Sequence, residues 1–430
     1  MSLKEPILTK RIPTAPWADP KTRSTISWEQ SIATGGYKAL EKALDMQPTD
    51  VINVVKDAVI RGRGGAGFPA GLKWSFLAPI DGGRRYLAVN CDEAEPGTFK
   101  DRVLIHTDPH QIIEGMIIVG YSVLAEKGII FIRSSYENAA RILEREIVRA
   151  KEAGFLGTNI LGSGFSMEIA VHRSAGRYIC GENTAQINAI EGRRANPMQP
   201  PPYSTEKGIW GLPTVTHNVE TLACVPHILR NGPEWFKNLA STPTGAGTKL
   251  YCVSGRVNRP GCFELPMGTR LSEIIEDHAG GLPKGCEYKA CLPGGASTRF
   301  LPREFYHIEM DFDAMKQAGH RLGTGSIIVF DHKTCLVGAT LNMLEFFARE
   351  SCGWCTPCRE GLPYIRDILA RIEAGEGREE FIPLLRRISK YLWNSYCALA
   401  PGAASPVESL LTYFEDEVQE HISQRRCPFK

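Results

Sequence analysis

The sequence lacks the features that mark several large classes of protein. No segment approaches the ~18 consecutive apolar residues of a membrane-spanning helix, and the N-terminus has no apolar core of a secretory signal. The 430 residues carry a net charge of only +2, which gives no electrostatic case for binding nucleic acid. There is no internal repeat or low-complexity segment. These absences predict an ordinary soluble globular protein, with about two to four domains at this length.

Cysteine, in contrast, is abundant, with 13 residues in the chain. Without an export signal, we expect a reducing compartment and no disulfide framework. Cys352, Cys355 and Cys358 follow one another at C-x2-C-x2-C spacing, and Cys397 follows 39 residues later. The other nine have no ligand spacing and are expected to be small buried side chains: Cys91, Cys180, Cys224, Cys252, Cys262, Cys286, Cys291, Cys335 and Cys427.

The spacing of Cys352, Cys355, Cys358 and Cys397 is typical of a [4Fe–4S] cluster, which carries one electron at a time. Zinc is the main alternative, but it usually takes two separated C-x2-C pairs or mixtures of cysteine and histidine. Free thiols are a further alternative. The pattern therefore makes electron transfer the leading question for this chain.

The first half of the chain alternates short apolar segments with helical periodicity. Strands are predicted at 86–90, 129–133 and 167–172, and helices at 48–60, 109–126, 137–153 and about 218–230. This alternation predicts an α/β layer fold. An extended arm and one short helix are expected within residues 1–47. The four prolines in 196–203 exclude regular helix and central strand there.

The second half changes character after a predicted linker at 243–247. Strands are predicted at 249–254, 262–265, 288–291 and 327–330, around one helix at 271–278, which together form a small α+β module. Four helices are predicted after it, at 339–351, 362–374, 379–392 and 406–422. The ligand-spaced cysteines fall at the ends of these helices, which predicts a small bundle that holds the metal centre.

A glycine-rich loop at residues 62–67 fits G-x-G-x-x-G, in which backbone N–H groups can point at a phosphate. In a dinucleotide-binding fold such a loop leaves a strand, whereas here it follows a predicted helix. A structural turn is therefore the alternative. Lys73 could add a cation, and Phe68 and Phe76 could form a stacking face, although such aromatic pairs are more often core.

Three carboxylates, Asp92, Glu93 and Glu95, come directly after the predicted strand 86–90, close to Asn90. Ligands of α/β folds bind at the carboxyl ends of strands. Carboxylates there could bind ribose hydroxyls and would repel a 2′-phosphate, which favours NADH over NADPH. A solvated loop is the alternative. Two further polar turns, at 176–184 and 216–221, each read as helix caps when taken alone.

Five segments carry a resemblance to a known family when they are taken together and in order: 61–74, 90–102, 178–182, 218–221 and 350–361. They resemble the flavin-bearing, NADH-oxidising F-type subunit of bacterial respiratory complex I. The resemblance covers roughly residues 25–425. It implies an N-terminal arm and Rossmann-like FMN domain at 1–240, a ubiquitin-like β-grasp (soluble-ligand-binding) domain at 248–335, and a helical [4Fe–4S] domain at 338–430.

The resemblance also implies a role for each matching residue. FMN would be held by Gly62, Arg63, Gly64, Gly65, Gly67, Lys73, Asn90, Asp92, Tyr178, Gly181, Glu182, Asn218 and Thr221. NADH would lie beside Phe68, Phe76, Glu93, Glu95 and Asn183, and the cluster would bind to Cys352, Cys355, Cys358 and Cys397. No catalytic side chain is implied, because FMN itself takes the hydride and electrons then leave singly through the cluster.

Two positions depart from the family pattern. Asn183 stands where the family usually has glutamate, and His217 stands where it usually has asparagine. Losing the carboxylate at 183 removes a negative charge near the nucleotide, so we hypothesise that Asn183 weakens discrimination against NADPH. His217 could contact the flavin phosphate or could serve as a helix cap.

The resemblance further implies partners and a location. Expected partners are a thioredoxin-like [2Fe–2S] subunit of E type and a large multi-cluster subunit of G type, within a peripheral arm on the cytoplasmic side of the bacterial inner membrane, with quinone as the final acceptor. One alternative is the diaphorase component of an NAD-linked hydrogenase or formate dehydrogenase. The other is a non-enzymatic zinc-binding scaffold that has kept the fold.

Overall fold

The first half of the chain forms a parallel four-stranded sheet. The structure, a computed structural model, describes residues 5–12, 24–77 and 83–430; the parts of the predicted arm at 1–4 and 13–23 lie outside the described residues. The strands are β1 (Tyr86–Cys91), β2 (Lys127–Arg133), β3 (Glu168–Ser174) and β4 (Thr214–Asn218), in the order β3-β2-β1-β4. The predicted α/β layer fold is confirmed, but β4 was not predicted.

Helices cover this sheet. Those that match the prediction are α3 (Pro48–Asp57), α6 (Pro109–Val123), α7 (Glu137–Glu152) and α9 (Val219–Asn231). Those not predicted are α4 (Ala70–Trp74), α5 (Lys100–Thr107) and α10 (Pro233–Lys237). The helix start predicted at the polar turn 176–184 is confirmed, because α8 (Asn183–Ile190) begins there with Glu182 as its N-cap. The prediction of a single short helix within residues 1–47 was wrong, because the described part of that region holds both α1 (Trp28–Ala33) and α2 (Lys38–Leu44).

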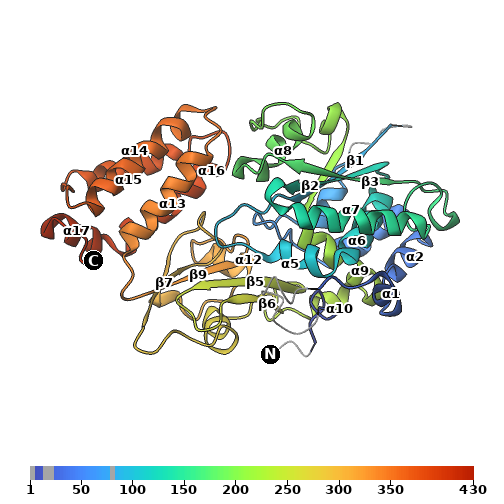
Figure 1. The fold of residues 1–430 in the computed structure, drawn as a ribbon, viewed down its shortest axis with the longest axis horizontal. Coiled ribbons are helices and arrows are strands. Elements are labelled where there is room, and N and C mark those ends of the chain that lie inside the picture. The colour runs from blue at the N-terminus through green and yellow to red at the C-terminus, as the bar shows by residue number, and fades with distance from the viewer. Residues whose placement is uncertain (1–4, 13–23, 78–82) are drawn as a thin grey trace.

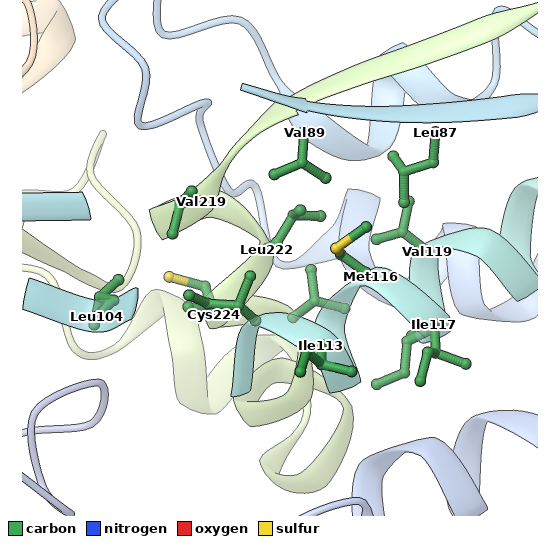
Figure 2. Close-up of a cluster of buried hydrophobic side chains, with 14 of the residues drawn as sticks. Leu87, Val89, Leu104, Ile113, Met116, Ile117, Val119, Val219, Leu222 and Cys224 are labelled. Carbon is green, nitrogen blue, oxygen red and sulfur yellow. The ribbon is translucent and has the colours of Figure 1, made fainter. Parts of the chain in front are cut away.

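One face of the sheet is buried against α6 and α9. Figure 2 shows Leu87 and Val89 of β1 facing Met116 of α6 and Leu222 of α9. The two helices approach closely because α6 carries Gly115, where a Cβ would lie 2.2 Å from the carbonyl oxygen of Leu222. Burial of these apolar side chains makes the main favourable contribution to the free energy of packing the helices on the sheet.

The second sheet is mixed and five-stranded, in the order β6-β5-β9-β7-β8. Its strands are β5 (Thr248–Gly255), β6 (Gly261–Pro266), β7 (Tyr288–Leu292), β8 (Leu301–Pro302) and β9 (Ser326–Asp331). All four predicted strands of this region are present. The helical turns beside the sheet are α11 (Leu271–Glu273), which continues to His278, and α12 (Phe312–Gln317).

The C-terminal region is helical, as predicted. It holds α13 (Leu336–Glu350), α14 (Thr356–Glu373), α15 (Phe381–Leu392), α16 (Leu399–Tyr413) and α17 (Glu415–Gln424), and Figure 1 shows it to one side of both sheets. Two predicted bounds were wrong. The helix expected from 362 begins at Thr356 and contains Pro363, and the single helix expected at 406–422 is two, of which α16 contains Pro406. None of the described helices has both the length and the apolar content to cross a membrane.

Buried α16 explains why the proline at 406 does not end the helix. Proline inside a helix removes one hydrogen bond and crowds the preceding turn. Leu399, Val407 and Leu410 of α16 are nevertheless buried in a core that the bundle shares with the second face of the parallel sheet. Tertiary burial outweighs the local preference here. This shared core places the start of α16 next to the carboxyl ends of the sheet strands.

Candidate functional site

A cavity of about 460 Å³ opens where the order of the parallel strands reverses. β2 and β3 lie on one side of β1 and β4 lies on the other, so the chain connections diverge between β1 and β4. At their carboxyl ends, Asn90 and Asn218 are paired in register, and both line the cavity. Open α/β sheets bind ligands at this type of strand reversal, and the volume lies within the usual range of ligand pockets.

The glycine-rich loop forms one wall of this cavity. It lies between α3 and α4, so it follows a helix, as the sequence indicated. Gly65 and Gly67 have φ values of +120° and +67°, which side chains rarely adopt. A Cβ on Gly67 would lie 2.5 Å from the ring of Phe312, and one on Gly64 would lie 3.2 Å from Cβ of Asn218. Glycine is therefore needed here both for the turn and for close packing of the loop.

Lys73 supplies a cation to the same wall. Its Nζ donates to the backbone oxygen of Thr216 at 2.8 Å and to the hydroxyl of Thr216 at 3.0 Å. Burial lowers the pKa of Lys73 to about 8. Loss of solvent contact is the one cause of this lowered pKa, with no contribution from a charged neighbour. A half-buried ammonium with neutral neighbours favours an anionic or electron-rich ligand atom.

His217, which also lines the cavity, is held as a neutral imidazole. The indole Nε1 of Trp74 donates to His217 Nε2, and an indole N–H can only donate, so Nδ1 carries the proton. Burial and the nearby Lys73 hold the pKa of His217 well below its usual range. The helix-cap alternative for His217 is wrong, because the side chain of Asn218 caps α9 by accepting from the N–H of Glu220.

Among the three carboxylates after β1, Asp92 keeps an oxygen for a ligand. Its Oδ2 accepts from the Ser174 hydroxyl at 2.8 Å, whereas Oδ1 is buried and has no partner among the described residues. Burial raises the pKa of Asp92 to about 6. The solvated-loop alternative does not hold for Asp92, which is 3% exposed.

The other two carboxylates are already bound within the protein. Glu93 accepts from the N–H of Asp101 at 2.8 Å and from Nε of Arg102 at 3.1 Å, which fixes the start of α5. Glu95 accepts from the hydroxyl of Tyr178 and from the N–H of Ser297, which belongs to a loop of the second sheet. Both still line the cavity. Glu95 thus joins the parallel sheet to the second sheet at this point.

Most residues that the sequence singled out for FMN and NADH line this one cavity: Gly62, Gly64, Gly65, Gly67, Phe68, Lys73, Asn90, Asp92, Glu93, Glu95, Tyr178, Gly181, Glu182, Asn183, Asn218 and Thr221. Two do not. Arg63 is fully buried and its guanidinium donates to the backbone oxygens of residues 246 and 248. Phe76 is half-exposed, with its ring centroid 6.2 Å from that of Phe68.

The opposite wall comes from residues that the sequence did not indicate. Loops of the second sheet contribute Gly294, Ser297, Arg321, Gly323 and Thr324. Thr98, Lys100, Asp101, Gln186 and Thr216 also line the cavity, as do Ala398 and Leu399 at the start of α16. The run Gly-Thr-Gly at 323–325 was the one local signal among these, and it is too short to mark a binding loop on its own.

Three buried polar atoms in the cavity wall have no partner among the described residues. They are Oδ1 of Asp92, Oδ1 of Asn183 and Nε2 of Gln186. Buried polar groups are normally paired, so these unpaired groups on cavity-lining residues fit a ligand that carries both hydrogen-bond donors and acceptors. The ribityl chain and ring edge of FMN have both, so the donor set fits a flavin.

The four ligand-spaced thiols come together at the end of the helical region that faces this cavity. Cys352 and Cys355 lie between α13 and α14, Cys358 lies in the first turn of α14, and Cys397 precedes α16. Burial raises the pKa of Cys358 to about 12, and repulsion from the other three thiols contributes to the rise. The fold therefore brings the distant fourth thiol beside the triple.

The spacing of these thiols separates the two metal alternatives. Zinc–sulfur bonds of about 2.3 Å hold tetrahedral ligands roughly 3.8 Å apart. In the described part of the chain, no three of these four sulfurs lie within 4.8 Å of one another. The arrangement is too open for one zinc ion and leaves room for a multinuclear cluster. Cys397 also lines the cavity, so the two centres adjoin.

Comparisons with known proteins agree with this division. A protein-family model described as "Nuo51 FMN-binding domain" matches residues 55–227, and one described as "SLBB domain" matches residues 250–301. A third, described as "NADH-ubiquinone oxidoreductase-F iron-sulfur binding region", matches residues 338–421. The three models follow the parallel sheet, the second sheet and the helical region in order.

Several curated relatives are similar over nearly their whole length. An F-type subunit of the NADH-quinone oxidoreductase of Rhizobium meliloti (strain 1021), the one numbered 2, is 47% identical over 92% of this chain and 94% of its own. The F-type subunit of the Escherichia coli (strain K12) enzyme is 49% identical over 90% of this chain and 88% of its own. Among solved structures, an NAD+-reducing [NiFe]-hydrogenase in the H2-reduced state superposes with a TM-score of 0.81 at 32% identity, over 96% of this chain and 71% of that one.

Proposed function

This chain belongs to the family of F-type subunits of NADH-quinone oxidoreductase, and from that premise we propose how its residues divide the work. The chain is an oxidoreductase subunit with an FMN-binding region and an iron–sulfur binding region. We assign FMN to the cavity at the strand reversal, with NADH entering beside it. We assign the [4Fe–4S] cluster to Cys352, Cys355, Cys358 and Cys397.

One observation supports this assignment of FMN and the cluster above the others: Cys397 lines the same cavity as the glycine-rich loop. Glu182 also lines the cavity and lies near Cys397, since its charge contributes to the raised pKa of Cys397. An electron donor in the cavity would therefore adjoin a ligand of the cluster. This adjacency is what single-electron transfer from one centre to the other requires.

When bound, FMN accepts two electrons as hydride from NADH and releases them singly, and the cluster carries them one at a time. The protein contributes binding and orientation. Backbone N–H groups of the glycine-rich loop and Lys73 would hold electron-rich atoms of FMN. Asp92 would offer its unpaired Oδ1 to a hydroxyl. Neutral His217 would present Nδ1–H as a donor, with Trp74 fixing its tautomer.

NADH would enter along the rim formed by Phe68 and Phe76. Both rings are about half-exposed, which leaves a face for stacking on the nicotinamide or adenine. Glu95 and Asn183 line the wall nearby. Glu93 contributes to the same wall, but its carboxylate is already bound to the start of α5, so we assign it a supporting role.

The chain assembles with other subunits of complex I. We further propose that the next electron acceptors are an E-type [2Fe–2S] subunit and a G-type multi-cluster subunit, on the cytoplasmic side of the bacterial inner membrane. Exposed aromatic side chains around the cluster thiols support a docking surface: Trp354, Trp393 and Tyr396 are each more than half-exposed.

We also propose that the domains are 1–240, 248–335 and 338–430.

A hydrogenase diaphorase is the second candidate, and the structural similarity to the NAD+-reducing hydrogenase supports it. Its identity of 32% is nevertheless lower than the 45–49% shared with the F-type subunits of NADH-quinone oxidoreductases.

An absorption spectrum of the purified protein, with iron and flavin analysis, tests whether it holds a flavin and an iron–sulfur cluster, which both candidate functions require. Flavin bands with a broad iron–sulfur shoulder support the proposal, and a colourless zinc protein would refute it.

Replacing Lys73 should weaken FMN binding. Lys73→Met removes a cation whose hydrogen bonds to an electron-rich atom contribute about 1.5–3 kcal/mol, so the dissociation constant should rise roughly 10–100-fold. In the unchanged protein, affinity should also fall as pH rises through about 8, where Lys73 loses its proton. Fluorescence titration of flavin-free protein measures both effects.

Lys127→Met is the matched control, because Lys127 is an exposed lysine at the start of β2. It should leave the dissociation constant and its pH dependence unchanged. Equal FMN affinity in Lys73→Met and Lys127→Met would remove Lys73 from the binding site.

Asn183 should set the choice of nucleotide. It is the first residue of α8, where the helix dipole attracts anions, and its Nδ2 donates to the Ser204 hydroxyl at 2.9 Å. Asn183→Glu adds a charge that repels a 2′-phosphate, which should raise the NADH to NADPH turnover ratio by roughly tenfold, or ~1–2 kcal/mol. Asn53→Glu, on the exposed side of α3, is the control. A ratio that stays the same in both variants contradicts the role of Asn183.

A further inference from the structure

Four side chains with metal-binding groups gather at the far end of the helical region. In the described part of the chain, one set of three or more His, Cys, Asp or Glu residues has all its ligand atoms within 4.8 Å of one another. It consists of Cys335, Glu373, His421 and Cys427. Cys335 caps the start of α13, Glu373 ends α14, His421 lies in α17 and Cys427 follows α17. None of the four is part of the cavity or of the cluster.

The distances inside this group match a mononuclear tetrahedral site. His421 Nε2 lies 3.3 Å from Cys335 Sγ and 3.2 Å from Glu373 Oε2, and Cys335 Sγ lies 3.3 Å from the same oxygen. Zinc bonds of about 2.0–2.3 Å place tetrahedral ligands roughly 3.3–3.8 Å apart. The four thiols of the cluster do not meet the 4.8 Å limit that this group meets.

Neighbouring groups already orient three of the four proposed ligands, His421, Glu373 and Cys335. Nδ1 of His421 hydrogen-bonds to the backbone oxygen of Glu417 at 2.7 Å, which places the proton on Nδ1 and turns Nε2 toward the group. Lys430 Nζ lies 2.8 Å from Glu373 Oε1, which leaves Oε2 to face inward. The N–H of Gly338 donates to Cys335 Sγ at 3.1 Å, a contact that favours a thiolate. Such supporting contacts accompany most metal ligands.

Charge and burial also favour a bound cation. His421 is fully buried and Cys427 is 4% exposed. With two thiolates, one carboxylate and the Lys430 ammonium, a divalent ion brings the net charge of the site to zero.

We propose that Cys335, Glu373, His421 and Cys427 bind one structural zinc ion. Two sulfurs, one imidazole nitrogen and one carboxylate oxygen complete a closed four-coordinate site, as structural zinc prefers. The ion would tie the chain after α17 to the helix pair α13 and α14. That pair carries Cys352, Cys355 and Cys358 at its opposite end, about 20 Å away along a helix of this length. Figure 1 shows α17 and the C-terminus beside the start of α13.

Elemental analysis and zinc-edge X-ray absorption of the full chain, purified with its cofactors, test the proposal. We expect about one zinc per chain, with both sulfur and nitrogen or oxygen neighbours at zinc bond lengths of roughly 2.3 and 2.0 Å. Cys427→Ser and His421→Gln should each lower the zinc content roughly tenfold or more, while the iron content stays unchanged. The zinc spectrum of the unaltered protein is informative even if a variant fails to fold.

Cys286→Ser is the control, because Cys286 is a half-exposed thiol outside the group and should leave the zinc content unchanged. Four results would each overturn the proposal. The first is a protein with only trace zinc, and the second is a zinc spectrum without sulfur neighbours. The third is zinc that persists in both ligand variants. The fourth is an intact mass that shows Cys335 and Cys427 joined in a disulfide.

Discussion

The Cys358→Ala variant is expected to lose the [4Fe–4S] cluster while it keeps FMN. Cys358 is buried in the first turn of α14, so no solvent ligand can easily replace its sulfur. Without a complete ligand set the cluster does not assemble stably. Electron transfer from NADH to the partner subunits should therefore fall by roughly 100-fold or more, because cluster assembly depends on each ligand.

Low-temperature electron paramagnetic resonance and iron analysis measure the loss, and fluorescence of released flavin measures FMN. The flavin should remain near the level of the unaltered protein, since the cavity wall does not include Cys358. Cys286→Ser is again the control for removing a thiol. A full cluster signal together with normal transfer in Cys358→Ala would show that the ligand assignment is wrong.

The Glu220→Gln variant is expected to be strongly destabilised. Glu220 is fully buried beneath the cavity, where its Oε2 lies 2.7 Å from Lys249 Nζ and 2.9 Å from Lys100 Nζ. Removing one member of a buried charge network costs about 3–5 kcal/mol. For 430 residues that unfold together, this loss lowers the melting temperature by roughly 3–6 °C. Differential scanning calorimetry measures it.

The same carboxylate predicts how stability depends on pH. Although burial raises the pKa of Glu220, Lys100 and Lys249 lower it to about 2. A depressed pKa stabilises the fold above the ordinary pKa of glutamate, and that stability is lost as pH falls through the folded value. Part of the acid sensitivity between about pH 4.5 and 2 should therefore vanish in Glu220→Gln.

Glu234→Gln is the matched control, because Glu234 is an exposed carboxylate in α10 that pairs with half-buried Lys237. It should change the melting temperature by less than about 1 °C, since surface ion pairs contribute little. If Glu220→Gln melts at the same temperature as Glu234→Gln, the buried network does not hold β5 to α5 and α9 as described.

The parallel sheet was largely predictable, because strands buried on both faces read as short apolar runs. β1 and β2 contain Leu87, Val89 and Ile130 in such runs. β4 was not predictable, since Val215 is its one aliphatic residue and its pairing with β1 comes from tertiary context. Two helix boundaries were predicted wrongly at Pro363 and Pro406, which lie inside helices in the structure. The reason is again tertiary context, because burial of these helices outweighs the local effect of proline.

The site was predictable where its signals are local. The thiol triple and the glycine-rich loop are read from spacing alone. Ser297, Arg321 and Thr324 were missed, because folding brings these loops of the second sheet to a cavity whose other predicted residues lie more than 70 positions away in the sequence. Cys335 and Cys427 were expected to be plain buried side chains, yet Cys335 is half-buried and both lie beside His421.

We propose that a flavin in the cavity passes electrons to a cluster on Cys352, Cys355, Cys358 and Cys397 of the same chain. Anaerobic addition of NADH to the purified protein, followed by flavin absorption and electron paramagnetic resonance, tests this transfer. We expect the flavin to bleach and the signal of a reduced [4Fe–4S] cluster to appear in the same sample. Flavin bleaching while the cluster stays oxidised would contradict it.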